Sequence, residues 1–291
     1  MGTRLFAALL AALLLLSLAA CSGEEDESEE ATDSEATVVS SDAEEETEDE
    51  PDPNCAELLE DFKYTEEDGV ITITGIKKKN VTSCKIPEEA SCIAGTAFRG
   101  NADLESIEIH DGVVSIGLGA FNGCVQLIET DGSVSYVDRW AVDCTEDAEN
   151  VTLRSDTVGI ADSVFAGCAK VKQITIPSTV KQIGAYAFSR CTALKSVELP
   201  EGISSLREYT FFACSSLESA SLPKGVETVG VYAFGECGSL AKVTLPSSVS
   251  AIGEGAFYRC DSLDEVSYGG NAEAWKKIDI DSQNQALTDA Y

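Results

Sequence analysis

The sequence predicts a solenoid of short, mostly parallel β-strands, built from about eight coils of 23 residues. Three observations predict this fold: a phenylalanine that recurs at a fixed interval, a pair of alternating aliphatic residues ahead of it, and a proline that follows most of these pairs. The chain has 291 residues, of which 44% are hydrophobic, so it is long enough to bury a sizeable core.

The phenylalanines set the period. They recur every 23 residues, apart from one gap of 44, at Phe98, Phe121, Phe165, Phe188, Phe211, Phe234 and Phe257. We interpret the long gap as one degenerate copy with Val142 in the phenylalanine position, which brings the array to eight copies.

Each copy has the same internal order, seen in residues 240–260, LAKVTLPSSVSAIGEGAFYRC. Alternating Val243 and Leu245 predict a short strand with one buried face. Pro246 ends that strand because proline has no N–H to donate to a sheet. A second aliphatic pair then points inward, an Ile-Gly pair turns the chain, and Phe257 fills the interior.

This pattern of leucine, isoleucine and phenylalanine positions, with a period between 20 and 29 residues, resembles the BspA type of leucine-rich repeat over residues 81–268. The resemblance implies a right-handed solenoid, commonly on a secreted or surface-anchored bacterial protein. One coil cannot bury its own apolar face, whereas stacked coils share a continuous core.

Both ends of such a stack need a cap. Residues 54–80 are expected to cap the first coil, with residues 62–76 forming a β-hairpin around Asp68-Gly69. Residues 269–291 are expected to cover the last coil, with Trp275 and Ile278 as its lid.

Residues 1–20 are predicted to be a signal peptide. Arg4 precedes an apolar run of 14 residues from Leu5 to Leu18, interrupted only by Ser17, which is too short for a membrane span and normal for a signal. The end, Leu-Ala-Ala followed by Cys21, resembles the lipobox of bacterial lipoproteins, which implies lipidation of Cys21 and anchoring on the outer side of the bacterial cell membrane. The alternative is an ordinary secretory signal with Cys21 incidental.

Residues 21–53 are predicted to be a disordered acidic tether. Positions 22–53 hold 16 Asp or Glu and no Lys or Arg, so the segment cannot bury enough apolar surface to fold, and its like charges extend it. We interpret it as a spacer between membrane and folded domain. The alternative is a tract that attracts cations.

Composition also makes some classes of function unfavourable. The whole chain has 51 acids and 20 bases, a formal charge of −31, which disfavours nucleic acid as a partner. The one histidine, His110, takes the proline position of its coil and is expected to be a surface residue at a strand end. No nucleotide-binding, metalloprotease or hydrolase motif occurs, and a solenoid offers no enclosing pocket. We therefore expect no catalysis, cofactor or metal.

The cysteines fall into two groups. Seven recur once per coil, at Cys124, Cys144, Cys168, Cys191, Cys214, Cys237 and Cys260. We expect them to be small buried groups, because a linear column of cysteines supplies neither a tetrahedral metal site nor facing disulfide partners. Near the N-terminal cap we expect one disulfide among Cys55, Cys84 and Cys92, with Cys55–Cys84 as the preferred pair, which leaves Cys92 without a role.

Partners would dock on outward-facing residues. The strand row is small, hydroxylated and mildly acidic, without the aromatic or Arg residues that anchor interfaces, at Glu108, Thr152, Thr175, Glu198, Ser221, Thr244 and Ser267. A second row, Tyr186, Tyr209 and Tyr232, with Trp140 in the same slot of the degenerate coil, is expected to form a column. That column is either a structural aromatic ladder or an adhesive strip for a protein or glycan ligand.

These features favour a surface-anchored lipoprotein that displays its repeats for protein or cell binding. The resemblance implies attachment to host or matrix proteins or to other cells, an analogy at the level of the fold. The alternative is a structural protein of the cell envelope with no specific external ligand.

Overall fold

The computed structural model describes residues 53–291. The predicted signal peptide 1–20, Cys21 and nearly all of the tether 21–53 lie outside the described residues. Residues 54–66 and 71–291 form one compact unit. Among the described residues, no helix is both long and apolar enough to cross a bilayer.

Most coils contribute a first strand at the alternating aliphatic pair. This first series consists of β1 (Cys55–Ala56), β4 (Ser83–Lys85), β6 (Ser106–Glu108), β11 (Asn150–Thr152), β13 (Gln173–Thr175), β16 (Ser219–Ser221), β18 (Lys242–Leu245) and β20 (Glu265–Tyr268). Its members pair in parallel as β1-β4-β6, β11-β13 and β16-β18-β20. The register repeats by coil, as Val151 opposite Ile174 shows, so the aliphatic residues all face inward.

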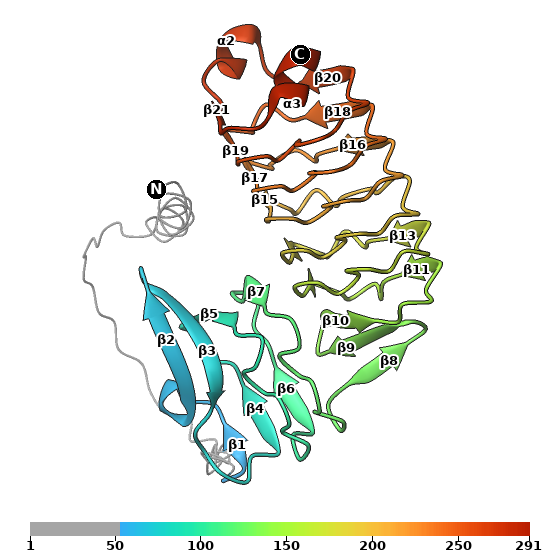
Figure 1. The fold of residues 1–291 in the computed structure, drawn as a ribbon. Coiled ribbons are helices and arrows are strands. Elements are labelled where there is room, and N and C mark those ends of the chain that lie inside the picture. The colour runs from blue at the N-terminus through green and yellow to red at the C-terminus, as the bar shows by residue number, and fades with distance from the viewer. Residues whose placement is uncertain (1–52) are drawn as a thin grey trace, which may run out of the picture. The chain divides into compact units, whose positions relative to one another are not determined.

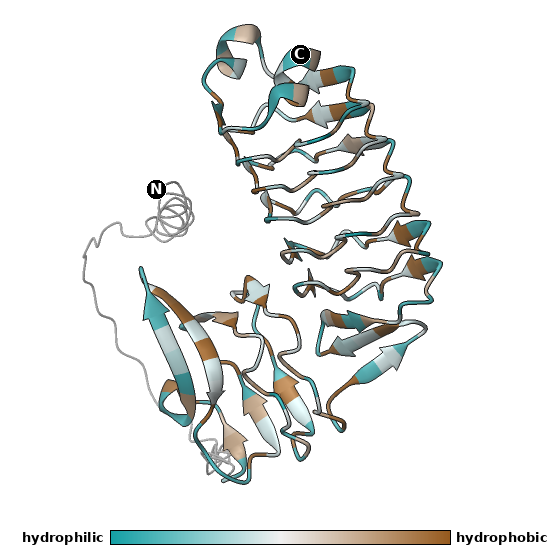
Figure 2. Ribbon diagram, viewed as in Figure 1, coloured by the Kyte–Doolittle hydropathy of each residue, from teal (hydrophilic) through white to brown (hydrophobic). Residues whose placement is uncertain are grey.

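A second series lies at the Ile-Gly turn. It consists of β3 (Val70–Ile76), β5 (Ala90–Ile93), β7 (Ser115–Ile116), β12 (Gly159–Ile160), β14 (Gln182–Ile183), β15 (Ser205–Leu206), β17 (Thr228–Val229), β19 (Ala251–Ile252) and β21 (Asp279–Ile280). The predicted solenoid of 23-residue coils is confirmed, and Figure 2 shows apolar positions recurring coil after coil. It has about nine turns. The extra turn arises because residues 54–80 form a coil themselves, with β1 on β4 and β3 on β5.

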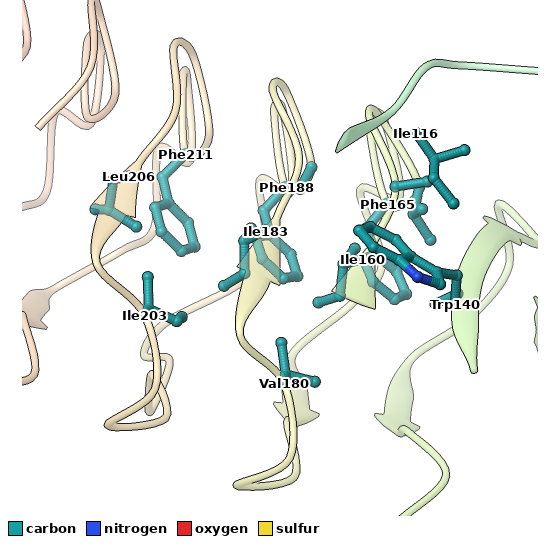
Figure 3. Close-up of a cluster of buried hydrophobic side chains, with 14 of the residues drawn as sticks. Ile116, Trp140, Ile160, Phe165, Val180, Ile183, Phe188, Ile203, Leu206 and Phe211 are labelled. Carbon is teal, nitrogen blue, oxygen red and sulfur yellow. The ribbon is translucent and has the colours of Figure 1, made fainter. Parts of the chain in front are cut away.

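The phenylalanines form the centre of the core. Every ring is buried, and neighbouring rings stack nearly parallel at 5.3 Å for Phe165–Phe188 and 5.1 Å for Phe188–Phe211 (Figure 3). Offset stacking at this spacing adds to the free energy gained from burial alone. The 23-residue interval therefore repeats one packing contact along the stack.

Five of the repeat cysteines complete this core. Each S–H donates to the carbonyl of the phenylalanine 26 residues earlier, for example Cys214 to Phe188 at 3.1 Å; the five are Cys124, Cys191, Cys214, Cys237 and Cys260. Burial raises the pKa of the Cys191 thiol to about 12, so it stays protonated and unreactive. Their interpretation as buried structural groups agrees with these contacts.

The degenerate coil departs from the prediction. It forms an antiparallel meander of β8 (Glu129–Asp131), β9 (Val134–Val137) and β10 (Trp140–Cys144), and β10 then pairs in parallel with β12. Val142 does not occupy the phenylalanine position: it is only half-buried and lies where the register of β10 shifts. Trp140 fills the core there (Figure 3). Its ring lies against Gly159.

The N-terminal turn carries the expected hairpin. A short 3-10 helix, η1 (Leu59–Asp61), leads into β2 (Phe62–Glu67), which lies next to β3 in the sheet order β2-β3-β5-β7. The turn Asp68-Gly69 has φ of 52° and 79°, as a two-residue hairpin requires. Phe62 is fully buried and packs edge-on against Phe98, so this segment covers the first phenylalanine.

The C-terminal segment contains α2 (Ala272–Trp275), β21 and α3 (Gln285–Ala290). Ile278 and Leu287 are buried, and β21 pairs in parallel with β19 as another coil would. Trp275 stacks on Tyr291 with ring centroids 3.8 Å apart. The segment thus supplies both apolar cover and strand hydrogen bonds to the last full coil.

Candidate functional site

Three tyrosines form a stacked column in the turns that follow β14, β15 and β17. The ring centroids of Tyr186 and Tyr209 are 4.6 Å apart with 4° between the planes, and those of Tyr209 and Tyr232 are 5.4 Å apart with 12°. Tyr186 is 41% exposed, and the other two are half-buried. The structure therefore brings together the three tyrosines that the sequence predicted, with Tyr186 presenting the most surface.

The backbone explains their alignment. Each tyrosine N–H donates to a carbonyl of the next coil: Tyr186 to Glu208 at 3.1 Å and Tyr209 to Val231 at 2.9 Å. All three have a left-handed φ, of 59°, 55° and 51° along the chain. This conformation is uncommon for bulky residues and costs about 1–3 kcal/mol each. The coil geometry imposes it, since Ser163 and Gly255 adopt it at the same position.

The column ends against the C-terminal segment. The Tyr232 hydroxyl donates to Gln283 at 3.1 Å, and its ring lies over Gly255, where a Cβ would meet it at 2.6 Å. Phe212 packs edge-on against Tyr209, and Tyr258 against Tyr232. These contacts fix the rings of Tyr209 and Tyr232, whereas the ring of Tyr186 lies at the exposed end of the column.

Trp140 does not belong to this column, so that part of the prediction is wrong. Trp140 is 2% exposed, lies on β10, and is not among the residues with a left-handed φ. The physical reason is the meander: in an extended strand the side chain at this position points into the core. Only coils with the regular turn place the residue two before phenylalanine on the surface.

A charged pair, which the sequence did not single out, lies beside the column. Asp162 accepts a hydrogen bond from the Ala185 N–H at 2.9 Å and lies 4.0 Å from the Arg207 guanidinium. Burial raises the pKa of the Asp162 carboxyl, although Arg207 opposes the shift. Asp162 immediately precedes Ser163, which holds the tyrosine position of its coil, and this adjacency is the sequence signal that could have located it.

The predicted Cys55–Cys84 disulfide is absent, because both residues are free thiols. Cys84 pairs with Ala56 and is buried, whereas Cys55 pairs with Ser83 and is half-buried. Neighbouring residues of a strand point to opposite faces, so this register turns the two thiols apart. Cys92 is likewise a free, half-buried thiol.

The strand row is exposed or half-buried and flanked by ion pairs between neighbouring coils. Lys172 lies 2.8 Å from Glu149, and Lys195 lies 3.2 Å from Glu218. Such solvated pairs contribute little stability, about 0–1 kcal/mol each. His110 follows β6, near the predicted strand end, but its side chain is only 11% exposed. Its Nδ1 accepts from the Gly112 N–H at 3.1 Å, so its Nε2 donates to the Pro87 carbonyl at 3.0 Å.

The described part of the chain offers little for enclosed chemistry. A cleft lined by Ile116, Gly119 and Val142, among others, holds about 40 Å³, space for one or two waters. Between residues 53 and 291, no three His, Cys, Asp or Glu side chains are grouped to hold a metal ion. The features suited to recognition are therefore the outer surfaces of the coils.

A stack of 23-residue coils with aliphatic strand positions, buried phenylalanines and an outward display of side chains defines a leucine-rich repeat protein. The BspA type leucine rich repeat region matches in six copies over residues 75–195 and 142–264. The chain belongs to this family.

Several solved structures of bacterial proteins are similar to this chain. A protein from Bacteroides ovatus is 23% identical, with 77% of this chain and 67% of that chain covered and a TM-score of 0.43. The leucine-rich repeat protein of T. pallidum is 22% identical, with 72% and 80% covered and a TM-score of 0.39. The pneumococcal vaccine antigen PcpA is 12% identical, with 72% and 64% covered and a TM-score of 0.48. No curated protein matches the sequence.

Proposed function

We propose that this protein is an exported lipoprotein, anchored through Cys21 on the outer side of a bacterial membrane, whose tyrosine column binds a protein or glycan on another cell or matrix. The observation that carries the proposal is the stack of Tyr186, Tyr209 and Tyr232 at the surface. The signal-like residues 1–20 and the acidic segment 21–53 support export and display.

The column has the properties of a binding anchor. Tyrosine offers a large rigid ring with a hydroxyl, which suits contacts with both apolar side chains and sugar faces. The three rings are held by neighbouring coils, so a ligand would not have to order them first. A bulky side chain in a left-handed conformation at a solvent-facing turn is uncommon. A purely structural role does not require such a side chain, since Ser163 fills the same position in its coil.

The test is a ligand panel with the domain 54–291. We expect saturable binding to one class of matrix protein or glycan, and loss of it in the triple variant Tyr186→Ser, Tyr209→Ser, Tyr232→Ser. Tyr64→Ser is the matched control, because Tyr64 is similarly exposed at 42% but lies on the N-terminal hairpin. Unchanged binding by the triple variant would exclude the column as the site.

Anchoring is tested separately. Cells expressing the full chain should incorporate labelled fatty acid into it and retain it in the membrane fraction, whereas Cys21→Ser should lose the label and enter the soluble exported fraction. Equal labelling of both forms would contradict lipidation at Cys21.

The strand row, with its small, hydroxylated and mildly acidic side chains, favours a second candidate function, that of a structural envelope protein without a specific external ligand. That row contains no aromatic or Arg side chain, although such residues commonly dominate binding energy. A panel without any saturable ligand would support this role.

A further inference from the structure

Cys144 and Cys168 differ from the other cysteines of the repeat column. The five regular thiols each donate to a phenylalanine carbonyl, whereas these two both approach the Thr145 carbonyl, at 3.6 Å and 3.8 Å. The cause is the meander in the degenerate coil. The residue 26 positions before Cys168 is Val142, on the irregular part of β10, so the regular acceptor is displaced.

The two thiols also influence each other, since both lie against the same carbonyl oxygen of Thr145. The neighbouring thiol lowers the pKa of Cys144 and raises that of Cys168. A thiol whose ionised form is favoured is the better nucleophile, and here its neighbour is a second thiol. Interaction with the Cys168 thiol is the largest cause of the lowered pKa of Cys144, whereas burial, Asp143 and Asp147 oppose the shift.

Cys144 is the most exposed cysteine of the repeat column. Cys144 is 8% exposed and Cys168 is 2% exposed, compared with 0% for Cys191 and Cys214. Ser133 and Thr145 line an open surface hollow, and the Cys144 thiol lies 3.6 Å from the Thr145 carbonyl oxygen. This hollow therefore offers a small disulfide reagent a path toward Cys144.

We propose that Cys144 and Cys168 are a redox-active dithiol that closes into a disulfide between neighbouring coils by exchange with an oxidant of the disulfide class. The bond would join the meander to the first regular coil after it. The proposal requires only such an oxidant and does not rest on ligand binding.

The chemistry balances in two exchanges. The Cys144 thiolate attacks one sulfur of the oxidant, which forms a mixed disulfide and releases one thiolate. Cys168 then loses its proton and attacks the Cys144 sulfur, which releases the second thiolate. Two protein thiols are oxidised to one disulfide, and the oxidant disulfide is reduced to two thiols.

The sequence permits a direct test on the full-length protein. Oxidised glutathione is titrated in, free thiols are alkylated in denaturant without reduction, and trypsin is added. Cleavage after Arg139, Arg154 and Lys170 places the two cysteines on separate peptides, 140–154 and 155–170. We expect these peptides to be recovered linked and to lose both alkyl labels together. Peptides containing Cys191 and Cys214, neighbours in the regular column, should stay alkylated.

Cys168→Ser provides the second measurement. This variant should stop at a stable glutathione adduct on Cys144. Oxidation should raise the melting temperature of the wild-type protein but not that of the variant. Peptides 140–154 and 155–170 recovered fully alkylated throughout the titration, or Cys144 bridged to a different cysteine, would overturn the proposal.

Discussion

The side-chain oxygen of Asn284 accepts a hydrogen bond from the backbone N–H of Phe257 at 3.0 Å. In the inner coils the corresponding N–H bonds to a backbone carbonyl of the next coil, as Phe211 does to Ala233 at 2.7 Å. Asn284 also donates to the Gly253 carbonyl at 3.0 Å and is 3% exposed. One amide therefore replaces the missing coil at the end of the phenylalanine column.

Replacing Asn284 with Ala should destabilise the protein by about 1–3 kcal/mol, because the Phe257 N–H would be buried without a partner, whereas the Gly253 carbonyl would still accept from the Ala256 N–H. Urea unfolding followed by circular dichroism measures the change. Gln285→Ala, an exposed neighbour on α3, is the control and should shift stability by less than about 0.5 kcal/mol. Equal stability of both variants would show that the cap does not depend on this amide.

Gly159→Ala should cost about 2–3 kcal/mol, because a Cβ at this position would meet the Trp140 ring at 2.4 Å within the core. Gly238→Ala is a matched control, since a Cβ there meets nothing within 4 Å. Thermal unfolding of the two variants should differ by several degrees. Similar melting temperatures would contradict the packing of Trp140 on Gly159.

Asp162→Asn should stabilise the protein increasingly as pH rises. Burial raises the pKa of this carboxyl in the fold, so the wild type keeps its full stability below about pH 4 and loses it as pH rises through the folded value. Asparagine has no charge to bury and can still accept from the Ala185 N–H. We expect a gain of about 1 kcal/mol at pH 7 and none near pH 3. The measurement is unfolding free energy against pH, with exposed Asp103→Asn as the control.

Tyr209→Asn should destabilise the protein more than Tyr186→Asn, by about 1 kcal/mol. Tyr209 stacks on a ring on each side, whereas Tyr186 stacks only on Tyr209, and asparagine tolerates the left-handed φ at both positions. Chemical denaturation of the two single variants measures the difference. The opposite order would mean that stacking does not set the stability of the column.

The sequence determined the repeat itself: the period, the inward aliphatic pairs, the phenylalanine column and the three aligned tyrosines. These follow from the sequence because each coil repeats the same local choice, and parallel pairing converts a 23-residue interval into spatial neighbours. Only the tertiary structure decided the exceptions. Val142 and Trp140 could not be placed because an antiparallel meander replaces their coil.

The Asn284 cap, the Asp162–Arg207 pair and the shared Thr145 carbonyl likewise depend on contacts between segments that no single repeat encodes. The same distinction explains the cysteines near the N-terminus. Their number permitted a disulfide, but the register of β1 on β4 turned Cys55 and Cys84 to opposite faces. Local sequence fixes what each coil buries, whereas the faces on which coils meet are set by packing along the whole stack.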